Sequence, residues 1–254
     1  MRPDTVIPRG VFFDLYGTLL PYGDMEAAWA DWLVALHAGL TAEGLAISRE
    51  ALADALDGFF GLPEPPDAGD GLTVYERRLR RLCAELGMAD VTATAIRRAA
   101  DASIESWDDH VTLDPQALPV LEALRPTKAL AMISNYDHHT YAYRLLARLG
   151  LAPLFEAIVI SGEVGVKKPD PRIFGPALEA TGLQPEEVVF VGDAPEDVAG
   201  ARAAGIRPVL IRRDDGTRTA IASDYTRERP AAAPPAKDDV TVIGALEEVL
   251  DLVS

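Results

Sequence analysis

Polar side chains with catalytic potential follow several apolar runs of this 254-residue chain. Carboxylates hold Mg²⁺ through oxygen, and an aspartate can also accept a phosphoryl group covalently. A lysine and a hydroxyl group bind phosphate oxygens. Each residue alone could be a turn former or a helix cap, but several at successive strand ends favour one site for phosphoryl chemistry. The residues are Asp14, Ser134, Asn135, Lys168, Asp193 and Asp197.

The apolar runs that precede these residues are short and rich in β-branched side chains, which is typical of strands buried on both faces. Segments with helical periodicity separate most of the runs. Strands that alternate with helices predict an α/β fold with a doubly wound parallel sheet and right-handed crossovers. Ligands bind such sheets at the carboxyl ends of the strands, where the polar residues lie. The runs cover residues 11–15, 129–134, 157–161, 188–192, 208–211 and 240–243.

One interval, residues 21–110, interrupts this alternation because it contains amphipathic helical patterns and no convincing strand. We therefore predict an α/β core domain of residues 1–20 and 111–254 with a helical subdomain of residues 21–110 inserted after the first strand. Inside the insertion, the Pro- and Gly-rich residues 61–72 are expected to form a mobile loop. Residues 214–239 are expected to form an extended surface loop.

The amino-acid composition narrows the classes of protein to which this chain can belong. Hydrophobic residues make up 48% of the chain and charged residues 25%, which is typical of a folded globular protein. The net charge of −16, without a Lys/Arg-rich block, argues against a nucleic-acid partner. The sequence has no signal-like N-terminus and no apolar run long enough to span a membrane, so we expect a cytoplasmic protein. Cys83 is the single cysteine and is expected in the core, which excludes an internal disulfide.

Four segments resemble the motifs of the haloacid dehalogenase (HAD) superfamily of hydrolases. FDLYGTL is similar to the first motif, MISN to the second, GVKKPDP to the third and VFVGDAPEDVAGARAAG to the fourth. The resemblance covers nearly the whole chain, and the helical insertion is similar to the C1 cap of this superfamily. It implies a HAD-like Rossmannoid core and a hydrolase, and it leaves the substrate open.

The resemblance also implies a role for each residue of the site. Asp14 would be the nucleophile and a Mg²⁺ ligand, with Asp193 as the second carboxylate ligand and Asp197 close by. The backbone carbonyl of Tyr16 would complete the protein ligands. Ser134 and the N–H of Asn135 would hold phosphoryl oxygens, and Lys168 would orient Asp14. Thr18 would shape the turn with Gly17 and is, with Asn135, a candidate for substrate binding.

Tyr16 departs from the pattern of the family's phosphatases, which usually place an acid/base aspartate at this position. Losing that group would lower the rate by roughly 10²- to 10⁴-fold. A tyrosine is similar instead to the 2-haloacid dehalogenase branch, in which a halide leaves without a proton. Asp193 argues against that branch, because its members lack a metal-binding carboxylate there. They also use an arginine at the start of the cap, and residues 21–47 contain none.

The sequence therefore favours a Mg²⁺-dependent phosphatase that acts on a small-molecule phosphate ester through an aspartyl-phosphate. The alternatives are a 2-haloacid dehalogenase-type hydrolase and a catalytically weak protein that binds a ligand or partner. His138 and His139 are candidates for the missing acid. We expect no nucleic-acid or membrane partner, and either a monomer or a homodimer.

Overall fold

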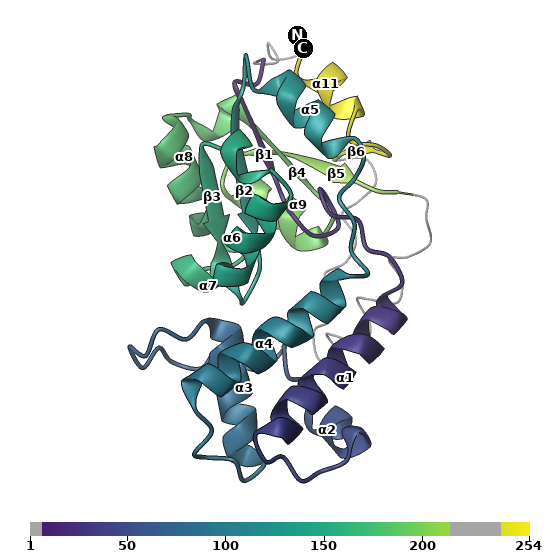
Figure 1. The fold of residues 1–254 in the computed structure, drawn as a ribbon. Coiled ribbons are helices and arrows are strands. Elements are labelled where there is room, and N and C mark those ends of the chain that lie inside the picture. Colours follow the sequence, from purple (N-terminus) through teal and green to yellow (C-terminus); the bar gives the residue numbers. More distant parts are fainter. Residues whose placement is uncertain (1–6, 214–239) are drawn as a thin grey trace. The chain divides into compact units, whose positions relative to one another are not determined.

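The fold is described by a computed structural model for residues 7–213 and 240–254, so the loop expected at residues 214–239 lies outside the described residues. All six predicted strands are present and pair in parallel. Their order is β3-β2-β1-β4-β5-β6 (Figure 1), which confirms the predicted doubly wound sheet. The strands are β1 (Gly10–Phe13), β2 (Ala129–Ser134), β3 (Ala157–Ile160), β4 (Val188–Gly192), β5 (Arg207–Ile211) and β6 (Thr241–Ile243).

The first strand lies in the middle of the sheet, between β2 and β4. Strand order reverses here, because the chain adds β2 and β3 on one side of β1 and then β4 to β6 on the other. Phe13 lies opposite Met132 of β2 and opposite Val191 of β4, so the ends of these strands are nearly level. The residues that follow them are therefore brought to one edge, at the topological switch point.

Helices cover both faces of the sheet (Figure 1). On one face, Phe12 and Phe190 of the sheet form a buried cluster with Ala177 of α8 and Ala201 of α9. On the other face, α5 and α6 lie in front of the sheet in Figure 1. The helices of this unit are α5 (Ala117–Leu124), α6 (His139–Arg148), α7 (Ser161–Val164), α8 (Gly175–Thr181), α9 (Pro195–Ala203) and α11 (Glu248–Leu252), with the short 3-10 helices η1 (Ala152–Leu154), η2 (Pro171–Phe174) and η3 (Pro185–Glu187).

Residues 22–112 form a second compact unit, made of α1 (Met25–Ala42), α2 (Arg49–Ala55), α3 (Val74–Glu85) and α4 (Ala93–Asp108). The sheet unit contains residues 7–21, 113–213 and 240–254 of the described chain. In the helical unit, α1 and α4 approach closely: a Cβ at Gly39 would lie 3.2 Å from that of Ala99. Cys83 is buried in α3, as expected.

The loop of residues 61–72, expected to be mobile, is held by arginines of α3. Arg77 donates to the carbonyls of Pro65 at 3.1 Å and Leu72 at 2.7 Å. The fully buried Arg78 donates to the carbonyl of Leu62 at 2.7 Å. A loop rich in proline offers carbonyls that its own N–H groups cannot bond, and the guanidinium groups supply those donors. These contacts attach the loop to α3, and its mobility stays a prediction.

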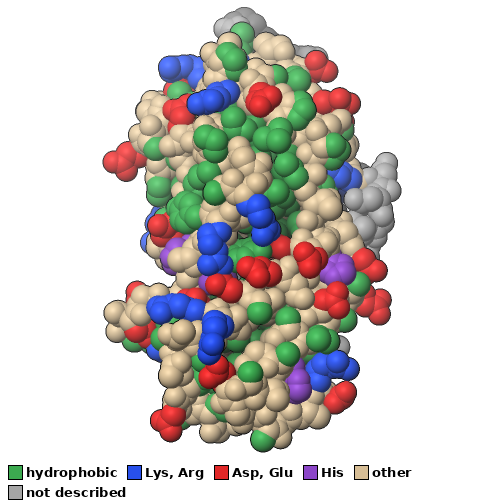
Figure 2. Space-filling view, viewed as in Figure 1, with side chains coloured by type: hydrophobic (Ala, Val, Ile, Leu, Met, Phe, Trp, Pro, Cys, Tyr) green, Lys and Arg blue, Asp and Glu red, His purple; other side chains and the backbone are tan. Residues whose placement is uncertain are grey.

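The surface carries mixed charge. On the face drawn in Figure 2, blue basic side chains lie among red acidic ones, and the described residues form no continuous basic stripe there. Among the described residues, no helix combines the length and the apolar character that a membrane crossing requires.

Candidate active site

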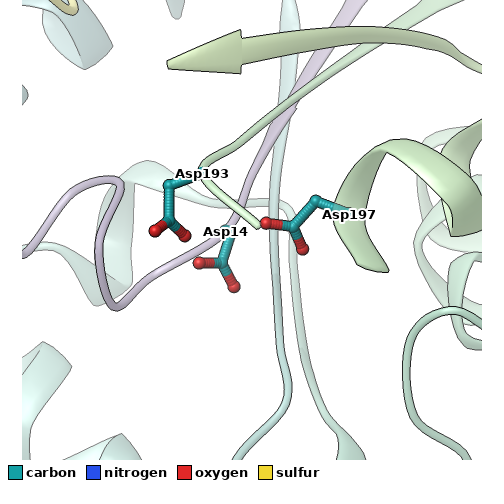
Figure 3. Close-up of side chains that lie close together, drawn as sticks. All are labelled: Asp14, Asp193 and Asp197. Atoms are coloured by element: carbon teal, nitrogen blue, oxygen red, sulfur yellow. The ribbon is translucent and has the colours of Figure 1, made fainter. Parts of the chain in front are cut away.

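Three carboxylates meet at the switch point of the sheet (Figure 3). Asp14 follows β1, Asp193 follows β4, and Asp197 lies in the first turn of α9. One oxygen from each carboxylate lies within 4.8 Å of the other two. A cluster of oxygen donors at this spacing could hold a divalent metal ion, and the all-oxygen donor set suits Mg²⁺.

Lys168 connects two of these carboxylates. Its ammonium group lies 2.6 Å from Oδ1 of Asp14 and 2.7 Å from Oδ1 of Asp197. It also donates to the carbonyl of Ile133 at 3.0 Å, and the side chain is almost fully buried. One ammonium and three carboxylates leave a formal charge of −2, which a divalent cation would balance.

Burial and charge act in opposite directions on this cluster. Burial raises the pKa of Asp14 to about 6, and the charge of Asp197 adds to this, although Lys168 pulls the pKa down. For Lys168, burial alone would lower the pKa, but Asp14 and Asp197 outweigh it and raise the pKa above its ordinary value. Lys168 therefore stays protonated, and Asp14 is more basic than an exposed aspartate.

Two glycines allow this close approach. Gly17 has a φ of +82°, and a Cβ there would lie 2.3 Å from Oδ2 of Asp193. A Cβ at Gly192 would lie 2.5 Å from the Cβ of Asp197. A side chain at either position would displace a carboxylate of the cluster, so both glycines are required by the site geometry.

Asp197 also caps its own helix. Its Oδ2 accepts a hydrogen bond from the N–H of Ala194 at 2.8 Å, while Oδ1 contacts Lys168. The two interpretations available from the sequence, helix cap and site residue, are therefore compatible.

Ser134 is the last residue of β2 and is buried, and Asn135 follows it. The Asn135 amide donates to the backbone carbonyl of Lys168 at 2.9 Å and accepts from its N–H at 2.8 Å. This pair of bonds fixes the loop that carries Lys168. The side chain of Asn135 thus holds another site residue, which the sequence did not indicate.

The structure also gives the surroundings of Tyr16, Thr18 and the two histidines that were candidates for the missing acid. Tyr16 is buried and stacks on Tyr136, with ring centroids 5.1 Å apart. Thr18 is fully buried, and its hydroxyl lies 3.5 Å from Oδ2 of Asp14.

His138 is buried at the start of α6 and stacks on Tyr141, which is typical of a core histidine. His139 is the first residue of α6 and is partly buried.

Two residues near the first motif, Arg213 and Asp114, were not predicted from the sequence. Arg213 donates to the carbonyls of Gly17 at 2.8 Å and Thr18 at 2.7 Å, and to Oδ2 of Asp114 at 2.6 Å. Arg213 lies two residues beyond the end of β5. The strand-end position that singled out the aspartates would have pointed to Arg213 as well.

The model for haloacid dehalogenase-like hydrolases matches residues 8–205. A phosphoserine phosphatase of Thermus thermophilus is 42% identical over 68% of this chain, and the match spans 63% of that relative, less than two thirds of its length. Two solved structures cover 97% of this chain and 98% of their own. They are a HAD phosphatase of Thermococcus onnurineus (23% identity, TM-score 0.65) and a 2-haloacid dehalogenase of Pseudomonas syringae (24%, 0.60), and these likenesses show the fold.

Proposed function

Since the chain belongs to the family of haloacid dehalogenase-like hydrolases, we propose that it is a Mg²⁺-dependent phosphatase acting on small-molecule phosphate esters. The observation that carries this proposal is the position of Asp193, which lies with Asp14 and Asp197 in one cluster of carboxylates. A metal ion at such a site would offset the negative charge of a phosphoryl group attacked by a carboxylate, whereas release of a halide has no such requirement. The name of the Thermus relative supports the same activity.

The cluster would hold the ion through the carboxylates of Asp14 and Asp193 and the backbone carbonyl of Tyr16, with Asp197 close by. When bound, Mg²⁺ would neutralise negative charge and orient the phosphoryl group.

Asp14 is the proposed nucleophile. Its carboxylate attacks phosphorus, the bond from phosphorus to the ester oxygen breaks, and the leaving group takes the electron pair. Water then attacks the phosphorus of the aspartyl-phosphate, which frees Asp14 and releases inorganic phosphate. With its pKa raised to about 6 by burial, Asp14 is ionised near neutral pH and still more basic than an exposed carboxylate.

Lys168 would hold Asp14 in the attacking orientation through its 2.6 Å contact. The hydroxyl of Ser134 and the N–H of Asn135 would bind phosphoryl oxygens as charge builds on them. Because Lys168 also contacts Asp197, the same ammonium group reduces repulsion between the two carboxylates.

Tyr16 determines which leaving groups are suitable. A phenol titrates near pH 10, so it is a poor base toward water at neutral pH. Leaving groups that need little protonation, such as aryl, enol or acyl phosphates, should therefore react faster than alkyl phosphates, by roughly 10²- to 10⁴-fold beyond the usual preference.

The test is phosphate release from a panel of aryl and alkyl phosphates, with wild type, Asp14→Asn and Asp193→Asn. We expect Mg²⁺-dependent release by wild type and loss of release in both variants. Release that survives Asp14→Asn would overturn the assignment of the nucleophile.

A 2-haloacid dehalogenase-type activity is the second candidate, and the observation in its favour is Tyr16. Attack of Asp14 on carbon would release a halide and form an ester that water hydrolyses. The same proteins should be assayed with 2-chloropropionate. Halide release that needs neither Mg²⁺ nor Asp193 would replace the phosphatase proposal.

A further inference from the structure

We propose that Arg213, together with Asp114, is a positioning residue that sets the geometry of the carboxylates Asp14 and Asp193. This inference rests on the proposed function, because it concerns the metal site of that activity. The guanidinium group binds two consecutive carbonyls, those of Gly17 and Thr18, at 2.8 and 2.7 Å. Both carbonyls belong to the turn that directly follows Asp14.

Each of the two residues held by Arg213 lies against one carboxylate of the cluster. The backbone of Gly17 packs against Asp193, because a Cβ there would lie 2.3 Å from Oδ2 of that residue. The hydroxyl of Thr18 lies 3.5 Å from Oδ2 of Asp14. A displacement of these carbonyls would therefore shift the surroundings of both carboxylates at once.

The turn also has hydrogen bonds within itself. These bonds can form its shape without Arg213, so Arg213 is needed only for the position of the turn. The N–H groups of Leu19 and Leu20 both donate to the carbonyl of Leu15 at 2.9 Å, and the N–H of Gly17 donates to that of Leu20 at 2.7 Å. These bonds define the shape of the turn. Arg213 contacts it from a distant part of the chain and so determines where the turn lies relative to β4 and β5.

Asp114 holds the guanidinium group in place. Its Oδ2 accepts from Arg213 at 2.6 Å, its Oδ1 accepts from the N–H of Gln116 at 2.8 Å, and its own N–H donates to the carbonyl of Leu19 at 3.0 Å. The side chains of Arg213 and Asp114 are 18% and 8% exposed, so solvent screens their ion pair only weakly. Asp114 thus anchors both Arg213 and the turn.

An arginine is required by this arrangement. Its planar fork reaches two carbonyls and a carboxylate at the same time, whereas a lysine offers one compact ammonium group. Arg213→Lys should keep the charge and lose part of the geometry, which separates the electrostatic effect from positioning.

The test compares Arg213→Ala, Arg213→Lys and Asp114→Asn with wild type. Arg9→Ala is the matched control, because it removes an exposed Arg-carboxylate pair with Glu187 in the same unit. Mg²⁺ binding without substrate is measured by calorimetry, with kcat and KM on an aryl phosphate at saturating Mg²⁺ and thermal unfolding of the metal-free protein.

We expect the dissociation constant for Mg²⁺ to rise by about 10- to 100-fold in Arg213→Ala. It should rise less in Arg213→Lys and Asp114→Asn, and stay unchanged in Arg9→Ala. At saturating Mg²⁺, kcat should fall while KM stays within about twofold, since Arg213 contacts carbonyls of the turn and is not proposed to contact the substrate. Added guanidinium should restore part of the Mg²⁺ affinity of Arg213→Ala and none of that of Arg213→Lys.

Mg²⁺ affinity equal to wild type in all three variants would overturn this inference, even if thermal stability falls. If Arg213→Ala does not fold, the Lys and Asn variants decide by the same measurement. Wild-type protein that binds no Mg²⁺ and releases no phosphate would overturn the proposed function and, with it, this inference. Unchanged variants of a Mg²⁺-binding wild type overturn the inference alone.

Discussion

At the scale of single residues, Asp14 lies between opposing influences. Burial raises its pKa to about 6, while the ammonium group of Lys168 at 2.6 Å stabilises the ionised form. A fully exposed carboxylate would be ionised at lower pH and would be a weaker nucleophile. Burial and the contact with Lys168 together keep Asp14 ionised near neutral pH, while its carboxylate stays more basic than an exposed one.

The first prediction concerns pH. Because the pKa of Asp14 is raised, its proton leaves only as the pH rises through about 6, and a proton and Mg²⁺ compete for the carboxylate. The dissociation constant for Mg²⁺ should therefore rise by up to about tenfold for each pH unit below 6 and level off above pH 7.

Calorimetric titration with Mg²⁺ at several pH values checks this expectation. Asp14→Asn, which cannot release a proton at this position, should bind Mg²⁺ more weakly and with a flatter pH dependence between about pH 5 and 7. An equally steep dependence in that variant would assign the titration to another group.

The second prediction concerns Tyr16. Tyr16→Asp should raise kcat/KM for alkyl phosphates by about 10- to 100-fold, because it supplies the missing acid. Tyr16→Phe keeps the ring that stacks on Tyr136 and serves as the control. The ratio of alkyl to aryl phosphate turnover, measured for all three proteins, should change in the Asp variant only. A selective loss of alkyl phosphate turnover in Tyr16→Phe would show instead that the phenol donates the proton.

At the scale of elements, the turn after β1 approaches β4 so closely that only glycine fits. We predict that Gly17→Ala weakens Mg²⁺ binding by more than about tenfold, because the new methyl group would displace the Asp193 carboxylate. Gly150→Ala is a matched control: its φ of +71° is equally unfavourable for alanine, but no atom lies within 4 Å of its Cβ position.

Both alanine variants should lose about 1–2 kcal/mol of unfolding free energy from the left-handed backbone, measured by denaturant titration. The difference in Mg²⁺ affinity between them isolates the contact with Asp193. Equal Mg²⁺ affinity of the two variants would contradict the tight packing of the turn against that carboxylate.

The elements of the sheet were predictable because each strand is a short apolar run between polar loops. β2 and β4 have the bounds read from the sequence, and the other strands differ by a few residues at most. Helix ends were less predictable. The apolar residues Leu52, Leu56, Phe59 and Phe60 have the spacing of one helix, yet α2 ends at Ala55. Those rings pack near Tyr75, at 6.5 and 6.1 Å between centroids, so tertiary packing produced the spacing.

Of the candidate site, the residues at strand ends could be placed from the sequence, because parallel strands bring their carboxyl ends to one edge. The contacts between loops could not be predicted from the sequence. The pairing of Asn135 with the backbone of Lys168, and of Arg213 with two carbonyls of the first turn, joins segments that lie far apart in the sequence. Backbone carbonyls are present at every residue, so no motif marks the ones that are used.

At the scale of the whole molecule, the helical unit is inserted between β1 and β2. We propose that this unit is a C1-type cap, since the insertion occurs at the point in the chain where the family carries one.

A further prediction follows from the net charge of −16. A negative field attracts cations, and salt screens it: the Debye length falls from about 20 Å to about 7 Å between roughly 20 and 200 mM NaCl. If the electrostatic energy of a unit charge at the site changes by about half of kT, that of a divalent ion changes by about one kT. The dissociation constant for Mg²⁺ should therefore rise about threefold over this range. Calorimetry at the two salt concentrations measures it. A dissociation constant that falls with added salt would show that the field at the site is positive.

The central position of β1 has a consequence for synthesis of the protein. β1 is flanked by β2 and β4, and β4 begins only at Val188. A nascent chain that stops before Val188 contains Asp14 but lacks one neighbour of β1 and also Asp193. Because chains fold as they emerge from the ribosome, the cluster of three carboxylates cannot form until β4 and α9 have been made. Fragments that end before Val188 should therefore lack the proposed metal site.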